Sequence, residues 1–125
     1  MKTNLLSALG VLVALTGFAG TAHAATGHAL PHNNTATYYA DKFEGRRTAN
    51  NERFEQDGLT AAHKTLPFGT RVKVTSLDTD RSVIVKINDR IPKHSNTSID
   101  LTKRAAKELG FFREGRADVK LKILE

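Results

Sequence analysis

Short segments in which apolar and polar residues alternate recur through the second half of the chain. Val72 and Val74 alternate with charged or polar neighbours, and Val119, Leu121 and Ile123 alternate with lysines and an aspartate. Alternation with a period of two is typical of strands that have one buried face and one wet face. Several such strands at close spacing predict a mainly β fold, in the form of a small closed barrel with one core.

Three more segments have the composition of strands. Segments 36–40 and 59–63 are short and contain aromatic or small apolar residues, and segment 81–88 is the most apolar of the three. One face of the last segment would carry Val83, Val85 and Ile87. Because Ile84 lies on the other face, we expect this strand to be covered on both sides.

One short α-helix is expected near the C-terminus. Helical spacing connects Leu101, Ala105, Ala106 and Leu109. Either Asp100 or Thr102 can cap the start of this helix, and Gly110 stands where a helix commonly stops.

The first 24 residues have the pattern of an export signal. Lys2 gives a positive start, a largely apolar run without charge covers residues 5–19, and small residues flank His23. We expect cleavage after Ala24; a retained membrane anchor is the alternative, although a span needs about 20 apolar residues. The chain has no cysteine, so it has no lipid-bearing cysteine. We expect a mature protein that is soluble in the periplasm or cell envelope, without a stable membrane anchor.

Segment 25–35 is expected to be a flexible lead-in to a single domain over 36–125, because it is small, polar and interrupted by Gly27 and Pro31. His28 and His32 stand four residues apart. Their neighbours argue against the helix that a metal-binding pair at this spacing would need. We therefore expect neither a metal nor another cofactor.

The chain is basic, with a formal net charge of +6. A basic surface favours loose attraction to polyanions, and simple solubility is the alternative explanation. Export and the absence of aromatic residues among the basic ones argue against nucleic acid as a partner. We expect a monomer.

Three polar residues are candidates for chemistry. Glu52 lies in a long polar loop, His63 ends a predicted strand and Asp89 closes the most apolar strand. Strand ends and long loops are common positions for functional sites. Each residue also has an ordinary explanation: Glu52 as an ion-pair partner, His63 as a satisfied polar residue and Asp89 as a turn former.

Each of these three residues belongs to a longer sequence motif. In chain order the motifs are Tyr38–Asn50, Glu52–Phe54, Leu59–Thr70, Asn88–Arg90 and Ile99–Leu101. In this order and spacing the chain resembles the rare lipoprotein A (RlpA) family, from about Thr37 to Ile123. The resemblance implies a six-stranded double-psi β-barrel with one short α-helix. It also implies lytic transglycosylase activity on peptidoglycan.

The resemblance further implies roles for individual residues. In the expected reaction the bond between N-acetylmuramic acid and N-acetylglucosamine breaks without water, and the muramic acid C6 hydroxyl closes a 1,6-anhydro ring. Asp89 would act as general acid and base, Glu52 would stabilise positive charge or raise the pKa of the acid, and His63 would position substrate or a carboxyl. The residues expected to bind substrate are Tyr38, Asn50, Arg90 and Asp100.

Three positions depart from the pattern of the family. Asn51 and Ile91 stand where glycine is usual, and Thr97 stands where arginine is usual. Asparagine tolerates positive φ, whereas a β-branched isoleucine beside Asp89 does not. These departures leave open an expansin-like module that binds or loosens wall glycans without cutting them. The sequence gives no positive sign of a third possibility, an effector or inhibitor that acts on a protein partner.

Overall fold

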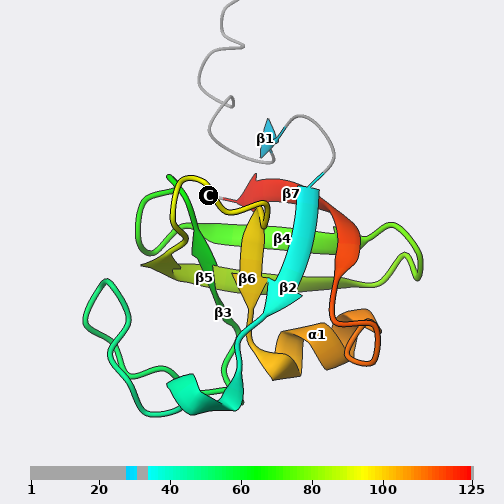
Figure 1. Cartoon of the computed structure of the whole chain (residues 1–125). Helices are drawn as coiled ribbons and strands as arrows, with labels where there is room; N and C mark the ends of the chain where they lie inside the picture. Colours follow the sequence, from blue (N-terminus) through cyan, green and yellow to red (C-terminus); the bar gives the residue numbers. More distant parts are fainter. Residues whose placement is uncertain (1–27, 31–33, 125) are drawn as a thin grey trace, which may run out of the picture.

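Within residues 28–30 and 34–124, the part of the chain that the computed structural model describes, there are seven strands and two short helices (Figure 1). The strands are β1 (His28–Ala29), β2 (Asn34–Tyr38), β3 (Thr60–His63), β4 (Arg71–Ser76), β5 (Ser82–Arg90), β6 (Ile99–Leu101) and β7 (Ala117–Leu124). The helices are a 3₁₀ turn, η3 (Asp41–Phe43), and α1 (Lys103–Leu109). The predicted export signal lies outside the described residues.

Six strands close into a barrel in the order β7-β2-β6-β3-β5-β4, and β4 pairs back onto β7. The pairs β2–β6 and β3–β5 are parallel, whereas the other pairs are antiparallel. Closure removes the free sheet edges that would otherwise attract other chains. The mainly β, six-stranded double-psi barrel with one short α-helix is therefore confirmed. All pairing within the barrel lies between residues 34 and 124, so a chain that begins at Ala25 contains all of it.

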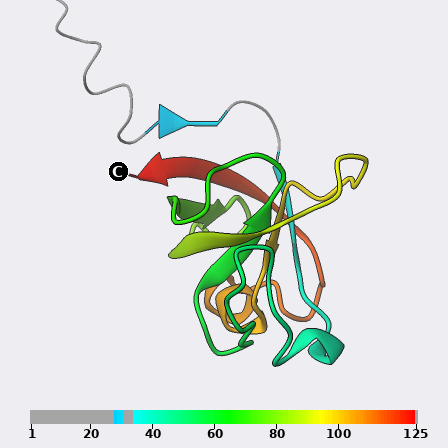
Figure 2. The ribbon, with the colours of Figure 1, turned by 90° about the vertical axis from the view of Figure 1, so that its left-hand side faces the viewer.

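The alternating residues point into the barrel and form its core. Val72 and Val74 of β4 are fully buried, and Val119 and Leu121 of β7 are 1% exposed. Helix α1 covers one end of the barrel, away from the C-terminus (Figure 1, Figure 2), and its apolar side packs into the same core. No helix among the described residues has the length and apolar composition needed to cross a membrane.

The outer face of β5 differs from the expectation. Ile84 is 42% exposed, so the prediction that both faces of this strand are covered is wrong. The six-stranded barrel has a single interior, and α1 closes its end rather than its side. An apolar residue on the outer face of β5 therefore remains in contact with solvent.

The lead-in also differs from the expectation where the structure describes it. His28 and Ala29 pair with Ile123 and Lys122 of β7, and β2 already begins at Asn34. Segments β1 and β2 thus pair along the same side of β7, although the region has too many turn-forming residues to look like a strand. Residues 25–27 and 31–33 of the lead-in lie outside the described part.

Strand β6 was not predicted, because the helical pattern included Leu101. The structure places Ile99–Leu101 between β2 and β3, and the helix begins only after Thr102. A segment of three residues is too short to show alternation, so its strand conformation depends on its neighbours. Thr102, and not Asp100, caps α1: its Oγ1 accepts a hydrogen bond from the Ala105 N–H at 3.2 Å.

Thr102→Ala tests this helix start. Thr102 is fully buried, and its hydroxyl also donates to the Gly58 carbonyl at 2.7 Å. Removal of the hydroxyl leaves both backbone groups without this partner, so we expect the free energy of unfolding to fall by about 1–3 kcal/mol. Thr102→Ser keeps the hydroxyl and should lose less in the same urea titration. Equal losses in the two variants would show that packing of the methyl group, rather than capping, matters here.

Candidate functional site

A row of four paired residues crosses four neighbouring strands. Thr37 of β2 pairs with Asp100 of β6, Asp100 pairs with Ala62 of β3, and Ala62 pairs with Asp89 of β5. Directly paired residues have their side chains on the same face of a sheet. The strand neighbours of Asp100 are buried in the core, so the row faces outward. Since strands lie about 4.8 Å apart, the Cα atoms of Asp89 and Asp100 are roughly 10 Å apart across Ala62.

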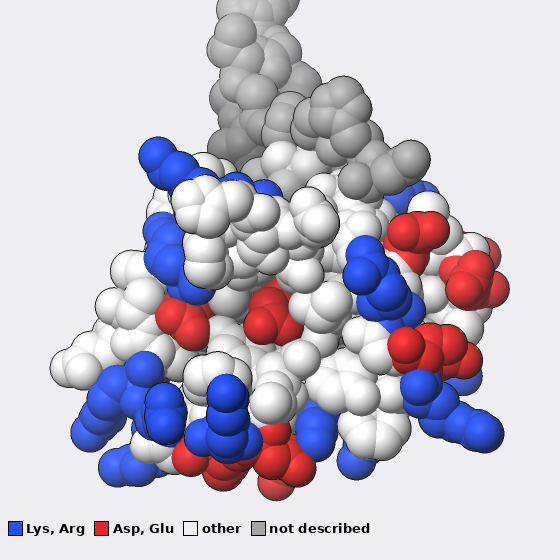
Figure 3. Space-filling model, in the orientation of Figure 1, with Lys and Arg blue, Asp and Glu red and all other residues white. Residues whose placement is uncertain are grey.

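All four residues of the row line one open pocket, which we call the Asp89 pocket. The pocket is also lined by Tyr39, Phe43, Arg46, Arg47, Arg90, Ile91, Pro92, Ser95 and Thr97. Figure 3 shows acidic side chains at the bottom of a hollow, with basic side chains on the surrounding surface. The site therefore offers two carboxyl groups to a polar ligand in an open cleft, with a small alanine between them.

Asp89 accepts three hydrogen bonds. The Tyr39 hydroxyl donates to Oδ2 at 2.5 Å, and the backbone N–H groups of Ala49 and Arg90 donate to Oδ1 at 2.8 and 2.9 Å. Burial and the hydrogen bond to Asp89 raise the pKa of Tyr39, so its phenol stays protonated and donates. An arrangement in which every partner donates suits an ionised carboxylate.

Asp100 lies in a drier environment. Burial raises the pKa of Asp100 to about 6; a hydrogen bond from Thr37 Oγ1 at 3.0 Å opposes this shift, and the negative charge of Asp89 adds to it. Desolvation and a neighbouring negative charge both favour the neutral form of a carboxyl. Asp100 therefore keeps a proton up to mildly acidic pH, next to a carboxylate that is surrounded by donors.

A β-bulge in β5 separates Asp89 from its neighbour Asn88. Ile87 pairs with Ala61, whereas Asp89 pairs with Ala62, so Asn88 is the extra residue of the strand. Bulges of this kind redirect side chains next to functional sites. Asp89 consequently belongs to the row, while the Asn88 Nδ2 donates to Glu52 Oε1 at 3.1 Å.

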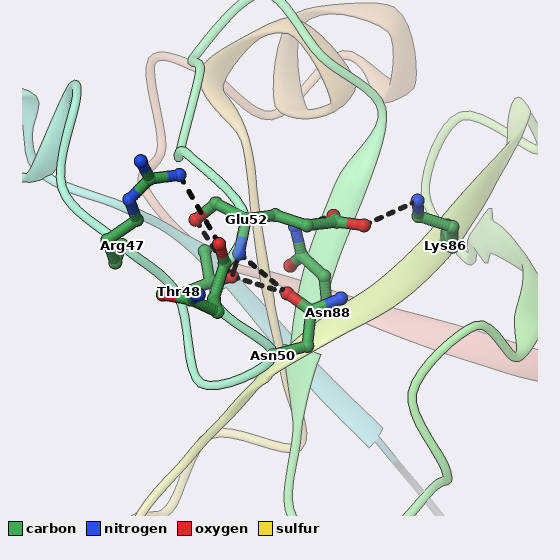
Figure 4. Close-up of polar contacts among 7 residues, drawn as sticks. Arg47, Thr48, Asn50, Glu52, Lys86 and Asn88 are labelled. Atoms are coloured by element: carbon green, nitrogen blue, oxygen red, sulfur yellow. Dashed lines mark hydrogen bonds and ion pairs between the residues drawn. The ribbon is translucent and has the colours of Figure 1, made fainter.

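Glu52 holds the loop that reaches Asp89, as the contacts in Figure 4 show. Besides Asn88, Lys86 Nζ lies 3.0 Å from Glu52 Oε2. The hydrogen bonds from Asn88 and Lys86 lower the pKa of Glu52, so its carboxyl is ionised. Glu52 does not line the Asp89 pocket. Its contacts instead fasten the loop to β5, where the Ala49 N–H donates to Asp89.

Asn50 and Asn51 shape the same loop. Asn50 Oδ1 accepts from the Thr48 hydroxyl at 2.7 Å and from the Glu52 N–H at 3.1 Å (Figure 4). Asn51 has a φ of 71°, in the left-handed region that asparagine tolerates. The asparagine at this usual glycine position is therefore compatible with the turn. Asn50 supports the loop rather than lining the Asp89 pocket.

His63 and Tyr38 lie away from the Asp89 pocket. His63 Nδ1 accepts from the Thr65 and Leu66 N–H groups, both at 3.1 Å. Burial first, and then the charges of Arg90 and Lys64, lower the pKa of His63. The neutral ring then carries its proton on Nε2 and shapes the turn after β3. Tyr38 donates to the Phe112 carbonyl at 2.9 Å and stacks on the Phe112 ring.

Tyr39 contacts Asp89 directly and is a residue of the pocket that the sequence reasoning missed. It follows the last residue of β2 and stacks on Phe54 at a centroid distance of 4.2 Å. The signal was present as two consecutive tyrosines, since neighbouring residues of an extended segment point to opposite sides. Nothing in the sequence alone shows which of the two tyrosines faces the aspartate.

The two other departures from the family's pattern fit the structure. Among the described non-glycine residues only Asn51 and Asp80 have positive φ, so the backbone at Ile91 suits a β-branched residue. Ile91 is 8% exposed and packs with Tyr39 and Phe54. Thr97 Oγ1 lies 3.4 Å from Thr37 Oγ1. A threonine here brings no cation toward Asp100, which agrees with the raised pKa of that carboxyl.

The described residues contain no group of three or more His, Cys, Asp or Glu side chains that could hold a metal ion. Of the seven residues predicted from the sequence to act in the site, Asp89, Arg90 and Asp100 line the pocket. The other four, Glu52, His63, Tyr38 and Asn50, do not line it.

Solved structures share this fold at low sequence identity. The Streptomyces papain inhibitor is 22% identical, with a TM-score of 0.60 over 75% of this chain and 94% of that chain. A Clavibacter michiganensis expansin mutant in complex with cellohexaose is 19% identical, with a TM-score of 0.58 over 74% of this chain and 50% of that chain. These two similarities support the fold alone.

Curated relatives are more similar in sequence. A probable endolytic peptidoglycan transglycosylase RlpA of Synechocystis is 53% identical over 90 residues, which cover 72% of this chain and 28% of the relative. The endolytic peptidoglycan transglycosylase RlpA of Pseudomonas aeruginosa strain UCBPP-PA14 is 51% identical over 91 residues, which cover 73% of this chain and 27% of the relative. The chain thus matches less than a third of the length of these relatives.

The resemblance to the RlpA family is confirmed by these relatives and by a family model. The model, named DPBB_1 and described as lytic transglycolase, matches residues 32–121. The match extends from just before β2 into β7 and includes every residue of the row that crosses the sheet. The chain therefore belongs to the lytic transglycolase family.

Proposed function

We propose that the chain is a lytic transglycosylase that cleaves the β-1,4 bond between N-acetylmuramic acid and N-acetylglucosamine in peptidoglycan, with formation of 1,6-anhydro-N-acetylmuramic acid. The observation that carries this proposal is the pair Asp89 and Asp100 on either side of Ala62 in an open pocket. Family membership and the names of the relatives support the same reaction.

The first half of the reaction needs a proton donor. Asp100 has the properties of this donor, because burial raises its pKa to about 6, so that it keeps a proton up to mildly acidic pH. Its proton would pass to the oxygen between the two sugars as the bond from that oxygen to the muramic acid C1 breaks. The positive charge that develops on the sugar ring is stabilised by nearby carboxylates, and Asp89 is the ionised carboxylate in the pocket.

The second half needs a proton acceptor. The muramic acid C6 hydroxyl attacks C1, and its proton passes to Asp89 as the new C–O bond closes the anhydro ring. The cycle leaves Asp100 ionised and Asp89 protonated, and exchange with water restores both. This division of work differs from the sequence-based expectation, which gave both proton transfers to Asp89. The single-residue mechanism remains the alternative.

The remaining residues act by positioning in this proposal. Tyr39 and the Ala49 N–H orient Asp89, and Glu52 holds the loop that provides that N–H. Arg46, Arg47 and Arg90 of the pocket lining would attract the carboxylates that peptidoglycan carries. Glu52 would therefore influence the reaction through Asp89 and its loop rather than through contact with the sugar. His63 would act by shaping the turn after β3.

The proposed substrate agrees with a place in the cell envelope. Cleavage of the signal after Ala24 and a soluble, monomeric form in the periplasm remain predictions of the sequence. Peptidoglycan strands are the proposed partner. The expansin-like alternative drew on the isoleucine beside Asp89; because Ile91 fits the backbone and packs in a buried cluster, this departure no longer favours a binding module over an enzyme.

Asp89→Asn is expected to abolish anhydro products. The amide cannot accept the C6 hydroxyl proton, so the rate should fall by about 10²–10⁴-fold or more, while the fold and glycan affinity persist. The measurement is mass spectrometry of peptidoglycan, and of glycan strands without stem peptides, after incubation with the chain from Ala25. Asp118→Asn, an exposed acidic residue of β7, is the matched control and should cut normally. Cutting by Asp89→Asn at the parent rate would refute this role.

Asp100→Asn separates the two mechanisms. If Asp100 donates the first proton, product formation should fall by about 10²–10⁴-fold, with glycan binding retained. A reduction of only a few fold would return both proton transfers to Asp89. If neither variant loses activity, the roles of both aspartates are refuted, although the chain still cuts. If the parent binds glycan strands without forming anhydro ends, the enzyme proposal fails and the binding module takes its place.

The raised pKa of Asp100 also predicts how stability depends on pH. The folded carboxyl binds its proton more tightly than the unfolded one, whose pKa is about 3.8. The free energy of unfolding should therefore fall as pH rises from about 4 to 6, by on the order of 2–3 kcal/mol from this residue. Asp100→Asn should lack that fall in urea titrations at each pH. Parallel pH profiles for the parent and Asp100→Asn would contradict the assignment.

A further inference from the structure

The outer face of β5, β4 and β7 forms a regular array of nine positions. From β5 through β4 to β7, Lys86, Arg71 and Leu124 form one row, Ile84, Lys73 and Lys122 the next, and Ser82, Thr75 and Lys120 the third. We call this array the basic face. It contains five cationic residues, two apolar residues, two hydroxyl residues and no acidic residue.

Most cations of the basic face lack partners among the residues that the structure describes. Lys86 is paired with Glu52, whereas Arg71, Lys73, Lys120 and Lys122 are exposed and have no side-chain hydrogen bond or ion pair among the described residues. Lys73 and Lys122 are direct cross-strand neighbours, an arrangement in which like charges destabilise a sheet. The repulsion between these lysines lowers the stability of the fold, and an anionic partner would offset that repulsion.

In the part of the chain that the structure describes, acidic residues occur only at the border of this array. Asp118 stands two residues before Lys120 in β7, just beyond the third row. Asp78 and Asp80 lie in the turn between β4 and β5. Among the described residues, the rows from Lys86 to Lys122 have no acidic neighbour other than Glu52, which is paired with Lys86.

Two observations favour a lipid surface over a soluble polyanion. Ile84, an exposed large apolar side chain, pairs directly with Lys73 in the middle row. A hollow that shares Lys73 with this pair is lined by the half-buried Leu30 together with Lys120 and Lys122. Cations with apolar groups between them match the chemistry of an interface of anionic headgroups above acyl chains.

The position of the basic face relative to the Asp89 pocket adds a consequence. In the closed ring of strands, β4 stands opposite to β6, and β4 lies behind β2 and β6 in Figure 1. The outward side chains of β4 therefore point away from Asp100. A flat surface bound to the basic face leaves the pocket open on the other side.

We propose that the basic face binds reversibly to an anionic lipid bilayer, which orients the barrel with the Asp89 pocket directed away from that membrane. This binding needs no catalytic activity. It adds a weak and salt-dependent attachment to a chain whose described residues include no membrane-spanning helix.

Vesicle co-sedimentation tests the proposal with the chain from Ala25. Binding is expected to vesicles of phosphatidylcholine mixed with phosphatidylglycerol in equal parts, and not to phosphatidylcholine alone. Lys73→Gln/Lys122→Gln should lower the partition coefficient by roughly 30-fold, since each lysine near such a surface contributes about fivefold. Because the substitutions relieve repulsion, the urea midpoint should stay the same or rise. High salt should weaken binding by the parent.

Matched variants distinguish binding by this face from the effects of net charge and of nonspecific apolar adsorption. Arg113→Gln/Arg116→Gln removes the same charge from exposed positions outside the array and should bind almost as the parent does. Ile84→Ser should weaken vesicle binding several-fold, whereas Leu77→Ser, at an equally exposed position in the β4–β5 turn, should not.

Three results would overturn the proposal. The first is equal partition of the parent onto the neutral and anionic vesicles. The second is an equal loss in the two double variants, because net charge alone would then be responsible. The third is competition by soluble polyphosphate as strong as that of anionic vesicles together with no effect of Ile84→Ser, since the partner would then be a polyanion rather than a bilayer.

Discussion

Strand β3 pairs with β5 along one edge and with β6 along the other, and this double pairing brings Asp89 and Asp100 to the two sides of Ala62. The two aspartates come from different strands, and these two strands do not pair with each other. Their separation is therefore set by the sheet and not by any loop. A small residue between them leaves space for a ligand above the sheet, so the register of one four-residue strand determines the geometry of the site.

The environments of the two aspartates differ because Asp100 lies in the middle of its strand, whereas Asp89 lies near the end of its strand after a bulge. Asp100 is in the middle of β6, where burial favours its protonated form, and Thr37 is its only side-chain hydrogen-bond donor among the described residues. Asp89 follows a bulge near the end of β5, where the loop held by Glu52 supplies the Ala49 N–H. Two carboxyl groups in different environments are what acid and base chemistry requires. Glu52 contributes to the environment of Asp89 from outside the pocket, because it holds the loop.

In our proposals, two opposite sides of the outer surface of the barrel have different functions. Positions around β6 carry the carboxyl groups, whereas positions around β4 carry cations and an exposed isoleucine. A closed barrel presents both sets at once because its strands surround a single core. Alternation along β4 and β7 was visible in the sequence, and with it the outward direction of Lys73 and Lys122. That these two lysines face each other follows only from the pairing of the strands.

The alternating valines, leucine and isoleucine determined by themselves that the chain is mainly β with one core. The sequence motifs identified the family and indicated Asp89 as a site residue. Local patterns carry this information because burial selects residues one position at a time. Only the tertiary structure decided that β6 is a strand, that Tyr39 rather than Tyr38 reaches Asp89, and that Glu52 and His63 lie outside the pocket. These features depend on hydrogen bonds between segments far apart in the chain, and such partners leave no periodic trace in either segment alone.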